Sequence, residues 1–266
     1  MAKEPGMTNL ANLLVTSTPG MVSIVVPCCG MLEYTKLCVP SVLRHSRAPF
    51  ELIFLDIGSL DGTVEYLAGL QAGLAGRVRV EVVRTPTDLG IKDACQKALD
   101  LTAGEYVCLL NNDTIVTAYW LEQLIALAGS SMAVGLVGPM SNYAAPPQLV
   151  ETVPYRTSPT PRQGAKGLAD VAAIDEFAKK HRDAHKGNWV FAERLGGFCV
   201  LIKRVVLDKI GDKLAEWTDL SLFDSDILSA KAQQEGYSLA VCRDLFVHHF
   251  GTRVFGHTAS KVQRQA

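Results

Sequence analysis

The feature that most restricts how this chain can fold is a regular alternation of short apolar runs with segments of helical spacing. Apolar runs cover residues 22–26, 51–56 and 105–110, and residues 78–83 alternate apolar with charged side chains, as a strand does. The helical segments follow at 33–46, 63–70, 91–101 and 118–128. This alternation predicts a mainly parallel central sheet with helices on both faces. Ligands of such sheets bind beyond the carboxyl ends of the strands. We therefore expect an α/β fold with its functional residues along one edge of the sheet.

The second half of the chain has a different texture. Six prolines lie between residues 139 and 165, which predicts an extended connection or a substrate-facing loop. Further elements are expected as a helix at 174–185, a strand at 195–202, a helix at 224–235, a strand at 238–242 and a strand-like run at 245–250. Residues 1–20 mix charge, proline and threonine, and we expect a flexible leader there, followed by one compact unit over 21–266.

Composition excludes several classes of function. Lysine and arginine number 26 against 27 acidic residues, without a basic block, so a nucleic-acid partner is not expected. No stretch approaches 18 consecutive apolar residues, and none resembles a signal peptide, so we expect no membrane span. The seven scattered cysteines include no C-x-x-C pair. Free thiols in this number predict a reducing, cytoplasmic location.

Two carboxylates stand where the second strand ends. Asp56 closes the apolar run 51–56, and Asp61 lies in the turn that follows, Gly58 to Gly62. A carboxylate in this place can accept hydrogen bonds from a nucleobase or from ribose hydroxyls. Asp61 has a second interpretation, as the cap of the helix beginning near Thr63. The sequence leaves both open for Asp61.

Oxygen-bearing side chains also follow the strand at 105–110. Asn111, Asn112 and Asp113 suit a hard divalent cation such as Mg²⁺ or Mn²⁺, although Asn and Asp are common in ordinary turns. His248 and His249 lie in a strand-like run, where neighbouring side chains point to opposite faces. One of the two can therefore face a metal while the other packs.

Asp224 and Asp226 precede an amphipathic stretch. Residues two apart on a helix do not share a face, so we expect the two carboxylates to have different roles. One would be a general base and the other a carboxylate favoured by the helix dipole. The alternative is that both cap the helix.

Five segments, taken in order, resemble family 2 glycosyltransferases of the GT-A fold. They are Val22 to Gly62, Leu109 to Thr114, Trp120 to Glu122, Val137 to Tyr143 and Leu195 to Cys199. The likeness extends over residues 21–255 and depends on the order and spacing of the motifs. It implies a GT-A domain with a nucleotide-sugar half at 21–135 and an acceptor and catalytic half at 136–266.

The resemblance also implies an activity. A member of this family transfers a sugar with inversion from a nucleoside-diphosphate sugar to an acceptor hydroxyl, assisted by Mn²⁺ or Mg²⁺. The acceptor, whether a glycan, a lipid-linked molecule or a protein, is not indicated.

Roles for individual residues follow from the same resemblance. Contacts to the nucleotide-sugar are implied for Pro27, Cys29, Asp56, Gly58, Asp61, Asn111, Asn112 and Gly197. Asp113 would bind the metal with His249, for which His248 is the alternative. Asp224 would be the catalytic base and Asp226 the second acidic position, whereas counting back from Gly236 without a gap puts Ser225 at the base position.

The sequence departs from the family pattern at three places. Cys28-Cys29-Gly30 replaces an aromatic residue and an Asn or Gly, Ile57 replaces Asn, and Asn111 replaces the first Asp of the metal motif. The open assignment of the base among residues 224–226 keeps a binding-only relative, which retains the fold and lacks the base, as an alternative. A sugar nucleotidyltransferase would need a basic, glycine-rich phosphate loop, and no basic residue lies in Pro27 to Gly30. A G-x-G-x-x-G motif is also missing after the first strand, which disfavours a dinucleotide enzyme.

Overall fold

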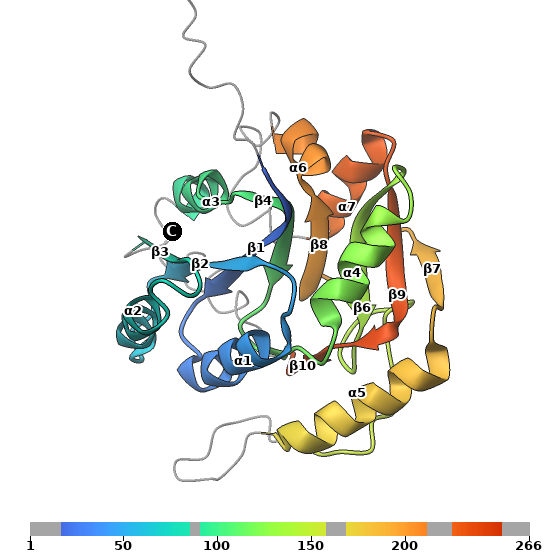
Figure 1. Ribbon diagram of the computed structural model, residues 1–266, viewed down its shortest axis with the longest axis horizontal. Helices are drawn as coiled ribbons and strands as arrows, with labels where there is room; N and C mark the ends of the chain where they lie inside the picture. Colours follow the sequence, from blue (N-terminus) through green and yellow to red (C-terminus); the bar gives the residue numbers. More distant parts are fainter. Residues whose placement is uncertain (1–16, 86–90, 158–168, 212–224, 252–266) are drawn as a thin grey trace, which may run out of the picture.

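The computed structural model describes residues 17–85, 91–157, 169–211 and 225–251. A large central sheet is flanked by helices on both faces (Figure 1). Its strands are β1 (Thr18–Cys28), β2 (Phe50–Ile57), β3 (Val80–Thr85), β4 (Gly104–Leu110), β6 (Val134–Met140), β7 (Trp189–Ala192), β8 (Cys199–Lys203) and β9 (Ser238–Phe246). The helices are α1 (Leu32–His45), α2 (Thr63–Gly73), α3 (Ile91–Asp100), α4 (Trp120–Gly129), α5 (Val171–His185), α6 (Arg204–Gly211) and α7 (Ser225–Gln234).

The eight strands are arranged in the order β3-β2-β1-β4-β8-β6-β9-β7. Strand β8 runs antiparallel to both of its neighbours, and β7 runs antiparallel to β9. The other six strands share one direction, so their carboxyl ends lie along the same edge. The expected α/β fold with a mainly parallel sheet is confirmed.

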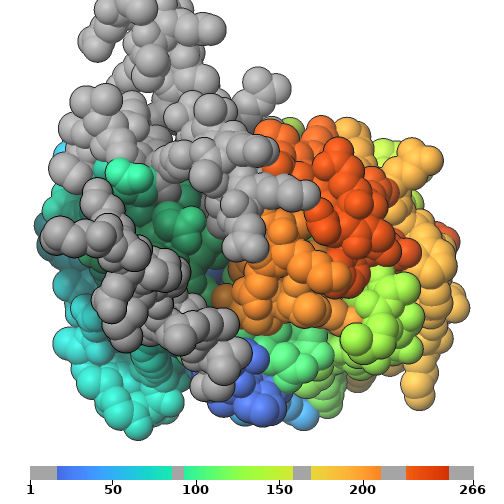
Figure 2. Space-filling model, turned by 90° about the horizontal axis from the view of Figure 1, so that it is seen from above, coloured from blue at the N-terminus to red at the C-terminus, as the bar shows by residue number. Residues whose placement is uncertain are grey.

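The sheet is continuous across the boundary expected between the two halves at residues 135 and 136. The strand order nevertheless puts the strands of the first half of the chain, β1 to β4, on one side of the sheet and those of the second half on the other. Seen from above, the cyan surface around α2 and the orange to red surface of the last third lie at opposite ends of the molecule (Figure 2).

Both faces of the sheet are buried, as a parallel sheet requires. Along β1, Ile24 and Val26 pack on the face that α1, α2 and α4 cover, and Val25 packs on the face that α3, α6 and α7 cover. Helix α5 packs on a smaller cluster that includes Ile115 and Phe246. The apolar runs of the sequence therefore become strands because helices cover them on both sides.

A small second sheet lies at the carboxyl edge. It pairs β5 (Thr114–Ile115) with β10 (His248–His249) in antiparallel register, so that His249 lies opposite Thr114. This pairing brings the segment after β4 against the segment after β9. The two candidate metal-binding motifs of the sequence thereby become neighbours.

Some expectations need correction. Strand β1 begins at Thr18, within the expected leader 1–20, because Thr18 pairs with Gly104 of β4; residues 1–16 lie outside the described residues. Strand β6 reaches Met140, inside the expected proline-rich connection, and Pro139 lies opposite Cys242 of β9. Strands β5, β6 and β7 and helix α6 were not expected from the sequence. Helix α6 follows β8 directly at Arg204, without a turn signal between them.

All seven cysteines are free thiols, and six of them are buried. Within the described residues, no helix combines the length and apolar character that crossing a membrane demands.

Candidate functional site

The loops after β1 and β2 are joined by Asp61. One carboxylate oxygen accepts the backbone N–H of Leu32 at 2.9 Å, at the start of α1, and the other accepts the Thr63 hydroxyl at 2.6 Å and amide at 3.3 Å, at the start of α2. Partial burial acts to raise the pKa of Asp61, but the hydrogen bonds from Thr63 and Leu32 outweigh it, so the pKa lies below its ordinary value. The N-cap position of α2 is Gly62, so Asp61 is the residue before the cap, and its carboxylate binds the first residues of both helices.

Asp56 is enclosed in the described structure. Its side chain is 0% exposed, its Oδ1 accepts the Ser59 amide at 3.3 Å, and its Oδ2 lies 3.2 Å from Nε of Arg84. Arg84 is itself 47% exposed, so the pair lies just below the surface of the carboxyl edge. The charge that ends the apolar strand is thus compensated by an arginine of the neighbouring strand β3.

Asn112 is engaged within the fold. Its amide nitrogen donates to the carbonyl of Gly30 at 3.2 Å and to the Thr35 hydroxyl at 2.9 Å, and the residue is 0% exposed, like Asp56 and Asp113. Asn112 thereby ties the end of β4 to the loop after β1.

Asp113 and His249 face each other. Oδ1 of Asp113 lies 3.3 Å from Nε2 of His249, with side chains 0% and 11% exposed. Nδ1 of His249 lies 2.9 Å from the carbonyl of Tyr143. Because a carbonyl only accepts, Nδ1 carries a proton and Nε2 is the nitrogen turned toward Asp113.

His248 points elsewhere, as the alternation along a strand requires. Its Nδ1 is 3.0 Å from the Tyr155 hydroxyl, and its ring meets that of Phe250 edge-on. Burial, and then the neighbouring His249, lower the pKa of His248 to about 4, against the opposing effect of Asp113. The structure therefore brings His249, and not His248, to the carboxylate of Asp113.

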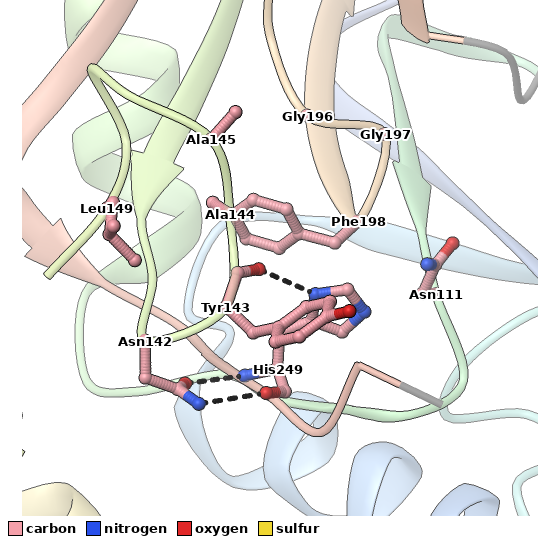
Figure 3. A pocket seen from close by; sticks show the side chains of 10 residues that line it. All are labelled: Asn111, Asn142, Tyr143, Ala144, Ala145, Leu149, Gly196, Gly197, Phe198 and His249. Atoms are coloured by element: carbon pink, nitrogen blue, oxygen red, sulfur yellow. Dashed lines mark hydrogen bonds between the residues drawn. The ribbon is translucent and has the colours of Figure 1, made fainter. Parts of the chain in front are cut away.

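A cavity of about 550 Å³ opens beside this pair (Figure 3). Its wall is formed by Asn111, Asn142, Tyr143, Ala144, Ala145, Leu149, Gly196, Gly197, Phe198 and His249. Of the residues predicted from the sequence, Asn111, Gly197 and His249 line it. Pro27, Cys29 and Gly58 lie at the ends of β1 and β2 and are not among the lining residues.

Two side-chain amides hold the wall of the cavity. Gln148, 1% exposed, donates to the carbonyl of Pro139 at 2.8 Å and accepts the amide of Gly196 at 2.6 Å. Asn142 binds the backbone of His249. Asn142 was recognised only as part of an acceptor-side segment, and Gln148 was not recognised at all. Their signal was weak, since an amide in a proline-rich loop has many possible roles.

The pair Asp113 and His249 fits a divalent cation. Nε2 of His249 is buried and has no hydrogen-bond partner among the described residues. Adjacent ligands of an octahedral cation are about 3 Å apart when each bond is about 2.1 Å, close to the observed 3.3 Å. No group of three or more His, Cys, Asp or Glu side chains suited to a metal occurs in the described part of the chain. A cation held here would take its other ligands from phosphate and water.

The expected catalytic segment is only partly described. Asp224 and the side chain of Ser225 lie outside the described residues. Asp226 lies in the first turn of α7, where its carboxylate is 65% exposed and 3.5 Å from Nη1 of Arg194. One turn later, the Ser229 hydroxyl accepts the amide of Leu195 at 3.2 Å. The start of α7 is therefore adjacent to the glycine wall at 196–197.

Comparison with known proteins supplies the family. The model of glycosyl transferase family 2 matches residues 23–166, more than half of the chain. A PGL/p-HBAD biosynthesis glycosyltransferase of Mycobacterium tuberculosis is 28% identical over 110 residues, covering 41% of this chain and 42% of the relative. The uncharacterized protein y4gI of Sinorhizobium fredii is 31% identical over 254 residues, 92% of this chain but only 26% of that protein. The chain thus matches less than half the length of these relatives.

Two solved structures share the fold. The mannosyltransferase PcManGT from Pyrobaculum calidifontis, solved with GDP-Man and Mn²⁺, superposes with a TM-score of 0.59 at 18% identity, covering 94% of this chain and 62% of that one. GalNAc-T7, solved with UDP, GalNAc and Mn²⁺, gives 0.58 at 15% identity, covering 86% and 43%. These similarities confirm the GT-A fold, and with the family match they show that the chain belongs to glycosyl transferase family 2.

Proposed function

We propose that this protein transfers a sugar from a nucleoside-diphosphate sugar to an acceptor hydroxyl, with inversion and with the help of a divalent cation, Mn²⁺ or Mg²⁺. The observation that carries the proposal is the approach of Asp113 to His249, 3.3 Å apart beside a 550 Å³ cavity at the carboxyl edge of the sheet. The two structural neighbours were solved with Mn²⁺, one with GDP-Man and the other with UDP and GalNAc, which supports this class of donor and cation.

Asp113 and His249 would hold the cation. When bound, the cation supplies positive charge that stabilises the departing diphosphate. The protein contributes a buried carboxylate and an imidazole whose proton is already placed on Nδ1 by Tyr143. The ligand pair therefore needs little rearrangement before the donor binds.

The nucleoside part of the donor would lie along the ends of β1 and β2. The residues expected at the nucleotide lie there: Pro27, Cys29, Asp56, Gly58 and Asp61. Ser59 and Asp61 join the two loops through hydrogen bonds from the amides of Gly30 and Leu32. The sugar would occupy the cavity, where Asn111 and Gly197 form part of the wall. Asn112 would support this edge from within the fold.

The acidic pair before and within α7 would provide the base. Asp224 would accept the proton of the acceptor hydroxyl, with Asp226 as the second acidic position. The acceptor oxygen then attacks the anomeric carbon opposite the diphosphate, and the bonding pair leaves with the diphosphate oxygen. The contact between Leu195 and Ser229, which places the start of α7 beside the glycine wall, supports this assignment.

A panel of UDP-, GDP- and dTDP-sugars, screened with and without Mn²⁺ by thermal shift and by donor hydrolysis, tests the proposal. We expect one donor to stabilise the protein only when Mn²⁺ is present, and Asp113→Asn to lose that effect. Asp175→Asn is the matched control, since Asp175 also lies 3.3 Å from an imidazole, that of His45, between α1 and α5. Stabilisation by no donor, or an Asp113→Asn variant that behaves like Asp175→Asn, would contradict the proposal.

The base assignment needs a separate test. We expect Asp224→Asn to bind the donor normally and to lose transfer to an acceptor, whereas Asp226→Asn should retain part of the activity. Donor binding without transfer in the unmodified protein, over a broad acceptor panel, would instead indicate the binding-only relative.

A further inference from the structure

Asn142, two residues beyond β6, binds the backbone of His249 at both of its polar groups. The amide N–H of His249 donates to Oδ1 of Asn142 at 3.0 Å, and Nδ2 of Asn142 donates to the carbonyl of His249 at 3.0 Å (Figure 3). One side-chain amide thus pairs with a whole peptide residue, as a neighbouring strand would. A side-chain amide carries a donor and an acceptor on neighbouring atoms, so it can serve both groups at the same time.

The next residue along the chain fixes the ring. The carbonyl of Tyr143 accepts Nδ1–H of His249 at 2.9 Å, and the Tyr143 ring meets the imidazole edge-on with centroids 5.5 Å apart. The Tyr143 amide in turn donates to the Ser141 hydroxyl at 3.4 Å. Consecutive residues of one loop therefore hold the backbone, the tautomer and the orientation of the imidazole of His249.

We propose that Asn142 is a positioning residue for the cation site. By holding the His249 backbone against the loop, it keeps Nδ1 on the Tyr143 carbonyl and Nε2 facing Asp113. This proposal rests on the proposed function, in which Asp113 and His249 hold the cation. A site with only two protein ligands depends strongly on their relative placement, and loss of such outer partners typically weakens metal binding about 10- to 100-fold.

Two substitutions remove different parts of the contact. Asn142→Ala leaves both backbone groups of His249 without the amide. Asn142→Asp keeps an acceptor for the His249 amide but places a carboxylate oxygen against the His249 carbonyl, where a donor is needed. The second variant preserves side-chain volume, so it remains informative should the first fail to fold.

A further variant separates positioning from general stabilisation. Gln71 donates to the carbonyl of Val80 at 2.9 Å, between α2 and β3, and Gln71→Ala removes a comparable side-chain to backbone bond away from the cavity. This variant should leave His249 unaffected if the Asn142 amide is what positions it.

The test measures Mn²⁺ affinity, with UDP and with GDP, by the electron paramagnetic resonance signal of free Mn²⁺. We expect Asn142→Ala and Asn142→Asp to bind Mn²⁺ about 10- to 100-fold more weakly, with Gln71→Ala within about twofold of the unmodified protein. Equal affinities in all three variants would overturn the proposal, as would an equal loss in Gln71→Ala.

A second measurement does not depend on metal. Nitrogen-15 NMR of the histidine rings at pH 8, with His249→Ala to assign the signal, should show the Nδ1-protonated form of His249 in the unmodified protein and a mixture of forms in Asn142→Ala. Should the unmodified protein bind no Mn²⁺, the proposed function fails, while the NMR measurement still tests whether Asn142 positions His249. An unchanged tautomer in both Asn142 variants would overturn the positioning role itself.

Discussion

The ring of Phe198 lies nearly parallel to the imidazole of His249, with an interplanar angle of 17° and centroids 5.1 Å apart. Phe198 is 3% exposed and lines the cavity, and its carbonyl accepts the amide of Asn111. One face of the candidate metal ligand is therefore covered by an aromatic ring. We expect Phe198→Leu to lower the free energy of unfolding by roughly 1 kcal/mol through the lost ring contact alone, and also to weaken Mn²⁺-dependent nucleotide binding.

Urea unfolding and thermal shift with Mn²⁺ and nucleotide check this prediction. Phe191→Leu is the matched control, because Phe191 also contacts an aromatic ring, that of Trp189 at 4.9 Å, but is 61% exposed at the edge of the sheet. That variant should leave nucleotide binding unchanged. Equal effects of the two substitutions on binding would show that the stack on His249 has no role in the site.

Asp61 provides a prediction on pH. Asp61→Asn should lower the free energy of unfolding at pH 7 by roughly 0.3–1 kcal/mol, because it removes a negative charge that accepts hydrogen bonds at the starts of both α1 and α2. The folded-state pKa of Asp61 lies below its ordinary value, and the unfolded value is about 3.9. The contribution of the Asp61 carboxylate to the free energy of unfolding is therefore fully present above the unfolded pKa. It is lost as the pH falls through the lower pKa of the folded state.

Urea titrations between pH 7 and pH 3 would follow this difference. The difference in the free energy of unfolding between the unmodified protein and Asp61→Asn should stay constant down to about pH 5 and become smaller below about pH 4. Asp100→Asn, which removes a carboxylate that accepts a bond from Gln96 on the surface of α3, should change stability by less than about 0.5 kcal/mol at any pH. A gap for Asp61→Asn that widens in acid would contradict the prediction.

The main elements of the fold were predictable because their signals are local. Each apolar run of the first half became a strand covered on both faces, and the alternation of His248 and His249 correctly put their side chains on opposite sides. Strand β6 was missed because Pro139 suggested the start of a loop. In the structure, Pro139 lies opposite Cys242, and this pairing partner comes from a distant part of the chain.

The site was less predictable for the same reason. Asn142 and His249 are 107 residues apart, and nothing in the local pattern of either indicates the other. Asn112 is a second example. Its neighbours in the motif suggested a ligand contact, and the sequence did not indicate that its amide donates to Gly30 and to Thr35 of α1, about 80 residues away.

Thiol reactivity tests the exposure of the carboxyl edge. Cys29 is the one cysteine that is not buried. Burial raises the pKa of Cys95 to about 12, and burial, opposed by the Thr114 hydrogen bond, raises that of Cys38 to about 12. Thiolate is the reactive form, so iodoacetamide at pH 8 should modify Cys29 first.

Mass spectrometry of the native protein over time measures this order. If Cys29 lies at the nucleotide, as proposed, Mn²⁺ with the donor found in the panel should slow its alkylation, and chelation of the Mn²⁺ should restore the rate. Cys29→Ser serves as the control for labelling elsewhere. Modification of the buried cysteines at a similar rate would contradict the described burial.

Gly251 offers a sharp test of the contacts around His249. Its φ is +70°, and a Cβ added there would lie 2.6 Å from the ring of Tyr143. Gly76 has a φ of +76° with no atom within 4 Å of an added Cβ. Gly251→Ala and Gly76→Ala therefore share the cost of a left-handed backbone, roughly 1–2 kcal/mol, and differ in the clash with Tyr143.

The difference between the two variants isolates that clash. Overpacking of this kind adds roughly 1–3 kcal/mol to the loss of stability, so Gly251→Ala should be the less stable variant in urea. Because the Tyr143 carbonyl orients His249, Gly251→Ala should also weaken Mn²⁺-dependent nucleotide binding, whereas Gly76→Ala should not. Adding Tyr143→Ala to Gly251→Ala should recover part of the lost stability, a coupling that additive effects would not produce. Equal stability and equal binding in Gly251→Ala and Gly76→Ala would show that the Tyr143 ring moves without consequence for His249.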